Sequence, residues 1–276
     1  MVEINGRRVM QGLGLRVITG LGLAVAALLL VLFAPAWLLA LLVAGLAGLG
    51  MREYLRLSCP ELVGPRGWLL WLLAAAIPTA GLLGAGALAG ALLLGLVLAA
   101  FLAMTGGGAV DAIQRRALNL GWGLAYCSGL LSCYLLLANL DQGRVLILYG
   151  VASVVAADTG AYFAGNLAGK HRLAPTLSPG KTWEGVIGGL IFTAVIGGLF
   201  AFLFLPDTRV LVGAGLSLAL GAISVVGDLL ESTLKRAVGA KDSGTLLPGH
   251  GGLLDRLDGI IAAAPLLLLA REIWWA

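Results

Sequence analysis

Charged side chains are scarce in this sequence of 276 residues. Asp, Glu, Lys and Arg together make up 12% of the chain, whereas a soluble domain carries about 25% charged residues. Hydrophobic residues make up 60%, so there is too little polar surface to cover a globule in water. The composition excludes an ordinary soluble protein and indicates that lipid covers most of the outside.

Cysteine and histidine are also few, with three Cys and two His. Cys59, Cys127 and Cys133 form no CxxC motif and no cluster with histidine, so neither a disulfide framework nor a zinc site is predicted. We interpret them as small packing residues. A basic tail is missing too, and the net charge of +4 does not indicate a nucleic-acid partner.

Long apolar runs dominate the chain instead. A transmembrane helix needs about 20 mainly apolar residues, and the run at 15–33 exceeds the roughly 7–15 residues of a signal-peptide core, so we expect it to be an uncleaved span. The sequence predicts an all-α, polytopic integral membrane bundle of about nine transmembrane helices. The predicted spans are 15–33, 36–51, 67–83, 86–104, 121–140, 145–166, 184–205, 210–231 and 259–275.

The 18 Lys and Arg residues predict the orientation, because cytoplasmic loops carry an excess of both. With the N-terminus inside, 15 of them fall in inside segments, and only Arg144, Arg209 and Arg271 fall outside. This split predicts that the N-terminus lies in the cytoplasm and the C-terminus outside.

Polar side chains are distributed unevenly between the two halves. Residues 1–144 are predicted to form structural, lipid-facing helices, because the first four spans carry almost no polar groups. Residues 145–276 are predicted to form the catalytic region with its cytoplasmic motif loops. Glycine pairs such as Gly165/Gly169 and Gly185/Gly189 allow close helix packing, and glycine-rich faces permit a homodimer.

Carboxylates recur at helical spacing near the predicted inner surface. Asp228, Ser232 and Lys235 follow each other at i, i+4 and i+7, and Asp255 and Asp258 at i and i+3, so each set shares a helix face. Asp228, Asp255 and Asp258 are therefore candidate ligands of Mg²⁺, which takes one or two carboxylates plus substrate phosphates, and a second cation is possible. The alternative is a set of structural ion pairs.

Asp158 lies within a predicted span, where a charged residue is costly and indicates function. It is a further candidate ligand, and the alternative is that it neutralises a lysine.

Phosphate-binding groups are predicted in the same two loops. The run Ser178-Pro-Gly-Lys181-Thr182 resembles the end of a P-loop, but Pro175 stands where that motif needs glycine. A Gly-Lys-Thr turn entering a helix still offers N–H groups and an ammonium to phosphate. The other candidate substrate-binding residues are Arg236, Lys241, Asp242, His250 and Arg256.

The run Ser232-Thr-Leu-Lys235-Arg236, Lys241-Asp242, Pro248-Gly-His-Gly-Gly252 and Asp255-Arg256-Leu-Asp258 closely resembles the signature of phosphatidate cytidylyltransferases, the CDP-diacylglycerol synthases. The stretches Asp158-Thr-Gly-Ala-Tyr162 and Ser178-Pro-Gly-Lys-Thr-Trp-Glu-Gly185 are also similar to that family. The resemblance effectively covers the C-terminal half.

The resemblance implies transfer of CMP from CTP to phosphatidic acid, with Mg²⁺, giving CDP-diacylglycerol and pyrophosphate. It implies that Asp228, Asp255 and Asp258 hold the metal. It implies phosphate contacts for five residues, which are Ser232, Lys235, Arg236, Lys181 and Lys241.

Two other functions remain open at this point. A CTP-dependent polyprenol kinase has a related membrane layout but lacks the full signature. An ion-coupled transporter of an anionic substrate would use intramembrane Asp158 and Asp228, although transporter sites lie between internal repeats and the sequence shows no repeat.

Overall fold

The computed structural model describes residues 25–62, 67–244, 246 and 251–274. Most of the predicted first span, 15–33, lies outside these ranges, and residues 25–33 are helical. The elements that follow are α2 (Ala36–Ser58), α3 (Gly67–Thr79), α4 (Ala85–Thr105), α5 (Val110–Leu124), α6 (Leu131–Ala138), α7 (Gly143–Ala168), β1 (Arg172–Ala174), β2 (Ser178–Thr182), α8 (Trp183–Phe204), α9 (Val210–Ala237) and α10 (Leu254–Trp274).

The predicted helical membrane architecture is confirmed in its class. Within the described residues, six helices are long and apolar enough to cross a membrane, and 67–83 forms a shorter apolar stretch. The number of spans and the orientation of the termini stay predictions. The span predicted at 121–140 belongs to a longer helix, Val110–Ala138, in which a π-helical segment, Ala125–Leu130, joins α5 to α6.

Large apolar side chains cover the outside of this bundle. On α4, Leu93 and Phe101 are 65% and 63% exposed, and on α8, Ile191 and Phe202 are 61% and 69% exposed. Water would disfavour such faces by roughly 25 cal/mol for each Å² of apolar surface. The exposed faces therefore fit the predicted lipid contact.

Small residues bring α7 and α8 into close contact, as the glycine pairs predicted. A Cβ on Gly189 would lie 2.5 Å from the carbonyl oxygen of Ala157, and one on Gly188 would lie 2.2 Å from the Cβ of Ala164. Only glycine fits at these two positions. The tight packing fixes α7 against α8 and holds the hairpin between them.

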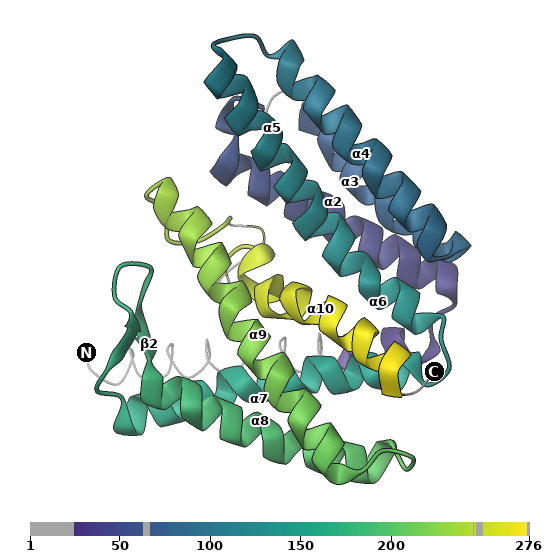
Figure 1. Cartoon of the computed structure of the whole chain (residues 1–276), viewed down its shortest axis with the longest axis vertical. Helices are drawn as coiled ribbons and strands as arrows, with labels where there is room; N and C mark the ends of the chain where they lie inside the picture. The colour runs from purple at the N-terminus through teal and green to yellow at the C-terminus, as the bar shows by residue number, and fades with distance from the viewer. Residues whose placement is uncertain (1–24, 63–66, 245, 247–250, 275–276) are drawn as a thin grey trace, which may run out of the picture.

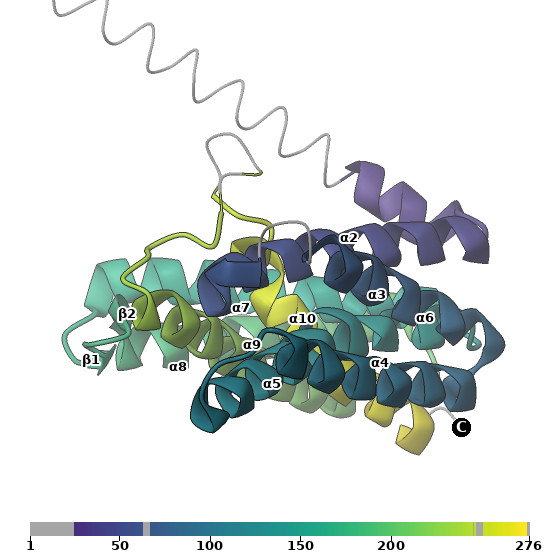
Figure 2. The ribbon, with the colours of Figure 1, turned by 90° about the horizontal axis from the view of Figure 1, so that it is seen from above.

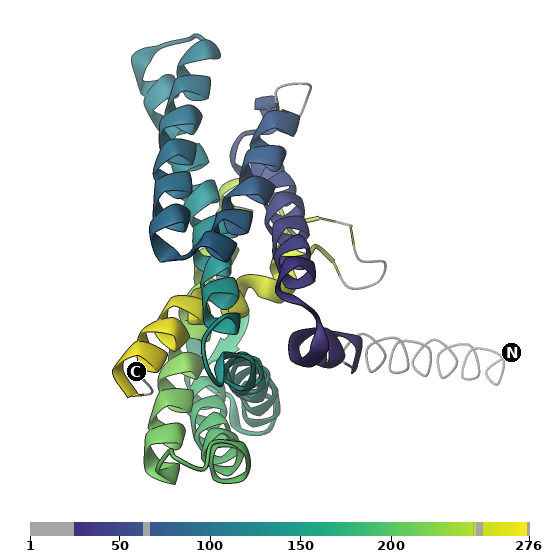
Figure 3. The same cartoon turned by 90° about the vertical axis from the view of Figure 1, so that its right-hand side faces the viewer.

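Helices α2 to α5 lie on one side of the molecule, and α7, α8 and part of α9 on the other (Figures 1 and 3). Helix α10 connects the two groups, since it packs against α6, α7 and α9 and its Ile260 carbonyl accepts a hydrogen bond from Tyr134 Oη at 2.9 Å. The hairpin and the C-terminal end of α9 lie on the left-hand side in both Figures 1 and 2, and α10 begins nearer the middle.

A reporter fused after Ala276 tests the predicted topology. Nine spans with the N-terminus inside place the C-terminus outside, so a reporter active only outside the cytoplasm is expected to be active. A fusion in the loop between α7 and α8 serves as the control and is expected to be active only with a cytoplasmic reporter. Cytoplasmic activity of the Ala276 fusion would contradict the odd number of spans.

Candidate active site

A pocket of about 460 Å³ opens between α7, the hairpin, α8 and α9. Its charged lining includes Asp158 from α7, Lys181 from β2 and Asp228 from α9. Lys181 Nζ lies 2.6 Å from Asp228 Oδ2, so the lysine of one predicted loop meets the aspartate of the other. This ion pair joins one motif loop to the other.

Three carboxylates interact around Asp228, and two of them, Asp158 and Asp228, line the pocket. Asp228 interacts electrostatically with Asp158 of α7 and with Asp258 of α10, and Ser232 Oγ donates a hydrogen bond to Asp228 Oδ1 at 3.3 Å. Lys181 is the cation that interacts with the same three carboxylates. Arg172 also lines the pocket, so two cations, Lys181 and Arg172, face three carboxylates, and the carboxylates remain in excess by one.

A second charged cluster lies one helical turn further along α9. Lys235 Nζ donates to Glu231 Oε2 at 2.8 Å and to Asp255 Oδ1 at 2.7 Å. The Glu231 side chain is 1% exposed and the Lys235 side chain 12%. Lys235 is therefore a nearly buried cation held by carboxylates from two helices.

Backbone N–H groups fix Asp255 in place. Its Oδ2 accepts hydrogen bonds from Gly252 N at 2.8 Å and from Ser243 N at 3.0 Å. Asp255 lies ahead of the apolar part of α10. Burial acts to raise the pKa of this carboxyl, but the hydrogen bonds from Lys235, Gly252 and Ser243 outweigh it and lower the pKa to about 2.

The predicted three-carboxylate set of Asp228, Asp255 and Asp258 does not form as one group. Asp255 binds Lys235, whereas Asp258 is near Asp228 and Asp158. Within the described parts of the chain, no group of three His, Cys, Asp or Glu side chains is arranged to hold a metal ion by itself. The excess negative charge around Asp228 and Asp258 nevertheless fits Mg²⁺, which needs one or two carboxylates and completes its ligands with phosphate and water.

Lys181 is presented by a strand rather than by the turn that the sequence predicted. Strand β2 pairs antiparallel with β1, with Arg172 opposite Thr182 and Ala174 opposite Ser178. Thr182 caps α8, because its Oγ1 accepts a hydrogen bond from Gly185 N at 3.1 Å. This two-stranded hairpin is the departure from the predicted all-α fold, and it holds Lys181 over the pocket.

Glu184 closes the base of the hairpin. Its carboxylate accepts hydrogen bonds from Lys170 N at 3.0 Å and His171 N at 3.2 Å, and it lies 2.6 Å from His171 Nδ1. The sequence motif around Lys181 therefore contains residues that build the hairpin as well as residues that face the pocket.

The other predicted substrate-binding residues are placed less centrally. Arg236 is exposed, and its Nε and Nη1 donate to the carbonyl oxygens of Leu177 and Ala240 at 3.1 and 3.0 Å, so it ties the hairpin to the end of α9. Ser178 begins β2. Lys241, Asp242 and Arg256 are exposed.

His250 lies outside the described residues. The structure therefore neither supports nor contradicts its predicted role.

Two carboxylates outside the predicted three-carboxylate set, Asp158 and Glu231, also belong to these clusters. Asp158 contributes directly to the pocket, and Glu231 is a ligand of the Lys235 ammonium. A signal for Glu231 was present, because it lies four residues before Lys235, the spacing at which a glutamate and a lysine meet on a helix.

Comparison with known proteins identifies the family of this chain. The sequence profile of the Cytidylyltransferase family matches residues 14–274. The chain belongs to this family. The match includes both halves, and so extends beyond the C-terminal half that carried the resemblance in the sequence.

Several relatives carry the name phosphatidate cytidylyltransferase. The protein of Pseudomonas aeruginosa is 38% identical over 242 residues, which cover 86% of this chain and 88% of the relative. The Haemophilus influenzae protein is 53% identical over 132 residues, 45% of this chain, and the Brucella suis protein is 42% identical over 175 residues, 62% of this chain. The chain spans 44% and 64% of the length of these last two relatives.

Proposed function

We propose that this protein transfers CMP from CTP to phosphatidic acid, giving CDP-diacylglycerol and pyrophosphate. The observation that carries the proposal is the pocket in which Lys181 meets Asp228, next to the cluster of Lys235 with Glu231 and Asp255. A family member with cations and excess carboxylates at one end of its bundle is suited to binding a nucleoside triphosphate together with a metal ion.

The reaction forms one P–O bond and breaks another. A phosphate oxygen of phosphatidic acid attacks the α-phosphorus of CTP, and the bond from that phosphorus to the bridging oxygen of pyrophosphate breaks. The nucleophile is already ionised, so no strong protein base is required. Lys181 and Lys235 would neutralise phosphate charge and hold the reacting groups in line, which are the main contributions of a protein to such a transfer.

The carboxylates near Lys181 would hold the metal ion. We propose that Asp228 and Asp258 bind Mg²⁺, with Asp158 contributing to the negative field, and that Asp255 acts by holding Lys235. When bound, the ion would supply charge neutralisation for the nucleotide phosphates.

The lipid substrate would reach the pocket from the bilayer. One aromatic side chain of its lining is open to the surroundings, because Tyr162 of α7 lines the pocket and is 67% exposed. We propose that this face of α7 and α8 admits the acyl chains laterally, while CTP enters from the cytoplasm, and that the protein resides in the bacterial inner membrane.

Purified protein incubated with CTP, phosphatidic acid and Mg²⁺ tests the function. The expected products are pyrophosphate and a lipid carrying CMP in equal amounts. A kinase acting on a polyprenol would give CDP and a phosphorylated lipid instead, and a transporter would consume no CTP. Either of those results would contradict the proposal.

Chelation tests the metal. Removing divalent cations with EDTA is expected to abolish turnover, because the carboxylates would then repel the triphosphate, and adding Mg²⁺ in excess is expected to restore it. Ca²⁺ is the control, since it has the same charge but a larger and more flexible coordination shell. It is expected to restore much less of the turnover than Mg²⁺ does. Full activity in EDTA would contradict the metal requirement.

A further inference from the structure

Glu53 is a buried carboxylate in the half of the chain that was predicted to be structural. It belongs to α2, it is 2% exposed, and it lies about 200 residues before the segment that it contacts. Burying a carboxylate is costly unless hydrogen bonds compensate it. The positions of its partners therefore indicate what the residue does.

Among the described residues, the two hydrogen-bond partners of Glu53 precede or begin α10. Its Oε2 accepts from Leu254 N at 2.9 Å and from Ser243 Oγ at 3.1 Å. Leu254 is the first residue of α10, so its N–H is one of those that the helix itself cannot pair. A carboxylate at that end also interacts favourably with the helix dipole. Glu53 thus caps α10 from another helix.

The contact continues into the charged cluster. Ser243 donates hydrogen bonds to two carboxylates: its Oγ donates to Glu53, and its N donates to Asp255. Asp255 in turn binds Lys235 at 2.7 Å. A continuous series of hydrogen bonds therefore runs from Glu53 of α2 to the Lys235 ammonium of α9.

The packing around Glu53 leaves no room for side chains. A Cβ on Gly252 would lie 1.9 Å from Ser243 Oγ and 2.8 Å from Glu53 Oε2, and one on Gly244 would lie 2.5 Å from Glu53 Oε1. The final glycine of the Pro248–Gly252 motif is thus required by the approach of the chain to Glu53.

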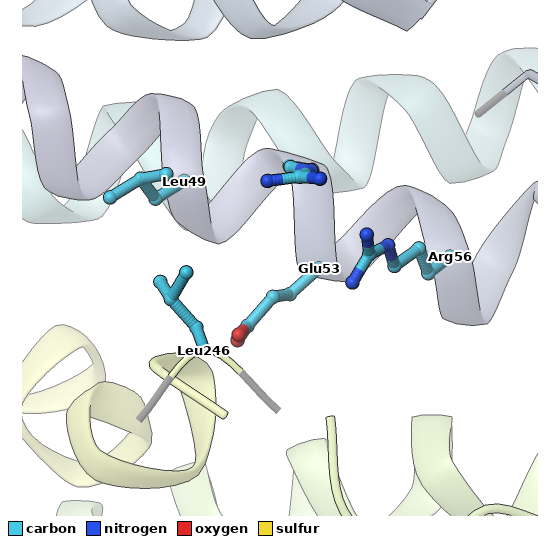
Figure 4. Close-up of a pocket in the computed structure, with 5 residues that line it drawn as sticks. Leu49, Glu53, Arg56 and Leu246 are labelled. Atoms are coloured by element: carbon cyan, nitrogen blue, oxygen red, sulfur yellow. The ribbon is translucent and has the colours of Figure 1, made fainter. Parts of the chain in front are cut away.

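Glu53 also borders a small cavity of about 220 Å³ lined by Leu49, Arg52, Arg56 and Leu246. Figure 4 shows the Glu53 side chain extending from α2 towards Leu246. The lining of this cavity thus brings the guanidinium groups of Arg52 and Arg56 to the same cavity as this carboxylate.

We propose that Glu53 is a positioning residue of the active site, which fixes the start of α10 and Ser243 and thereby places Asp255 and Lys235 for CTP binding. The proposal rests on the proposed function. It also assigns to α2 a direct part in building the site, beyond lipid contact.

Glu53→Ala and Glu53→Gln separate this role from others. The glutamine carbonyl can accept both hydrogen bonds that Oε2 accepts, so Glu53→Gln is expected to keep the KM for CTP within about threefold of the wild type. Glu53→Ala is expected to raise the KM for CTP between about ten- and a hundredfold, the cost of a small displacement of positioned groups, with a smaller change in kcat. Glu61→Ala, at an exposed carboxylate that follows α2, is the control and is expected to match the wild type.

Ser243→Ala serves if Glu53→Ala does not fold. It removes the Oγ–H that donates to Glu53 and keeps the N–H that donates to Asp255, so a smaller rise in the KM for CTP is expected. An unchanged KM for CTP in the alanine variants, with only less active protein, would show a purely structural role and overturn the proposal. Equal loss in Glu53→Gln and Glu53→Ala would show that the charge itself acts, and would overturn it too.

Hydrogen exchange at the Ser243 and Leu254 amides gives a readout that does not depend on catalysis. Exchange is expected to be at least tenfold faster in Glu53→Ala than in the wild type, and close to the wild type in Glu53→Gln. Unchanged exchange in Glu53→Ala overturns the positioning role. Absence of CTP turnover in the wild type would refute the proposed function, and exchange would still decide whether Glu53 positions Ser243 and α10.

Discussion

Asp258→Asn is expected to lower kcat by about a hundredfold or more, while the protein still folds and inserts. The substitution keeps the size of the side chain and removes one of the three carboxylates that interact around Asp228. Loss of a ligand charge would weaken the proposed metal site, and even outer-shell changes cost about 10–100-fold. Activity measured over a range of Mg²⁺ concentrations is expected to require more metal in the variant.

Asp111→Asn is the matched control. Asp111 is 65% exposed and pairs with Arg115 on the surface of α5, where an ion pair contributes about 0–1 kcal/mol. The same chemical change there is expected to leave kcat and the Mg²⁺ requirement unaltered. A near-normal rate in Asp258→Asn would show that Asp258 is structural and would move the metal proposal to Asp228 and Asp158.

The lengths of two of the apolar helices could be predicted well, because their hydrophobic runs end where the helices end. The spans predicted at 86–104 and 184–205 correspond to α4 (Ala85–Thr105) and α8 (Trp183–Phe204). The meeting of the two motif loops was also predictable, and Lys181 and Asp228 are its direct result.

Which carboxylate binds Lys235 and which one lies near Asp228 could not be predicted from spacing. Asp255 and Asp258 share a helix face, yet Lys235 and two backbone N–H groups hold Asp255, and Asp258 is left near Asp228. The choice depends on where α9, Ser243 and Gly252 lie against α10. The periodicity of residues within one helix does not predict how other segments pack against that helix.

Glu53 was missed for a related reason. The predicted second span ended at residue 51, whereas α2 continues to Ser58, and a charged residue just past an apolar run is normally solvated. Strand β2 escaped too, because its sequence, Ser-Pro-Gly-Lys-Thr, has low strand propensity. The burial of Glu53 and the formation of strand β2 each depend on a partner from another segment of the chain, which the local sequence does not reveal.

Lys235→Arg is expected to lower kcat/KM for CTP by at least about tenfold, and Lys235→Ala by about a hundredfold, both with near-normal expression. An anchoring lysine extends its ammonium to water and tolerates arginine. Lys235 differs, because its side chain is 12% exposed and its Nζ lies 2.8 Å from Glu231 and 2.7 Å from Asp255. Arginine is longer, planar and forked, so it would displace these carboxylates or the phosphates beside them.

The comparison is made with the cytidylyltransferase assay at saturating CTP and at a tenfold lower concentration. Arg115→Lys, at a position 71% exposed on α5, is the control for exchanging the two basic residues and is expected to be silent. A phosphate ligand predicts the larger defect at low CTP, because weakened binding of substrate is overcome when CTP saturates. If Lys235→Arg equals the wild type at both concentrations, Lys235 is an anchor. Phosphate binding would then have to come from Lys181, which already faces the pocket, together with Lys241 and Arg236. The last two are exposed, so their side chains would have to turn towards the pocket.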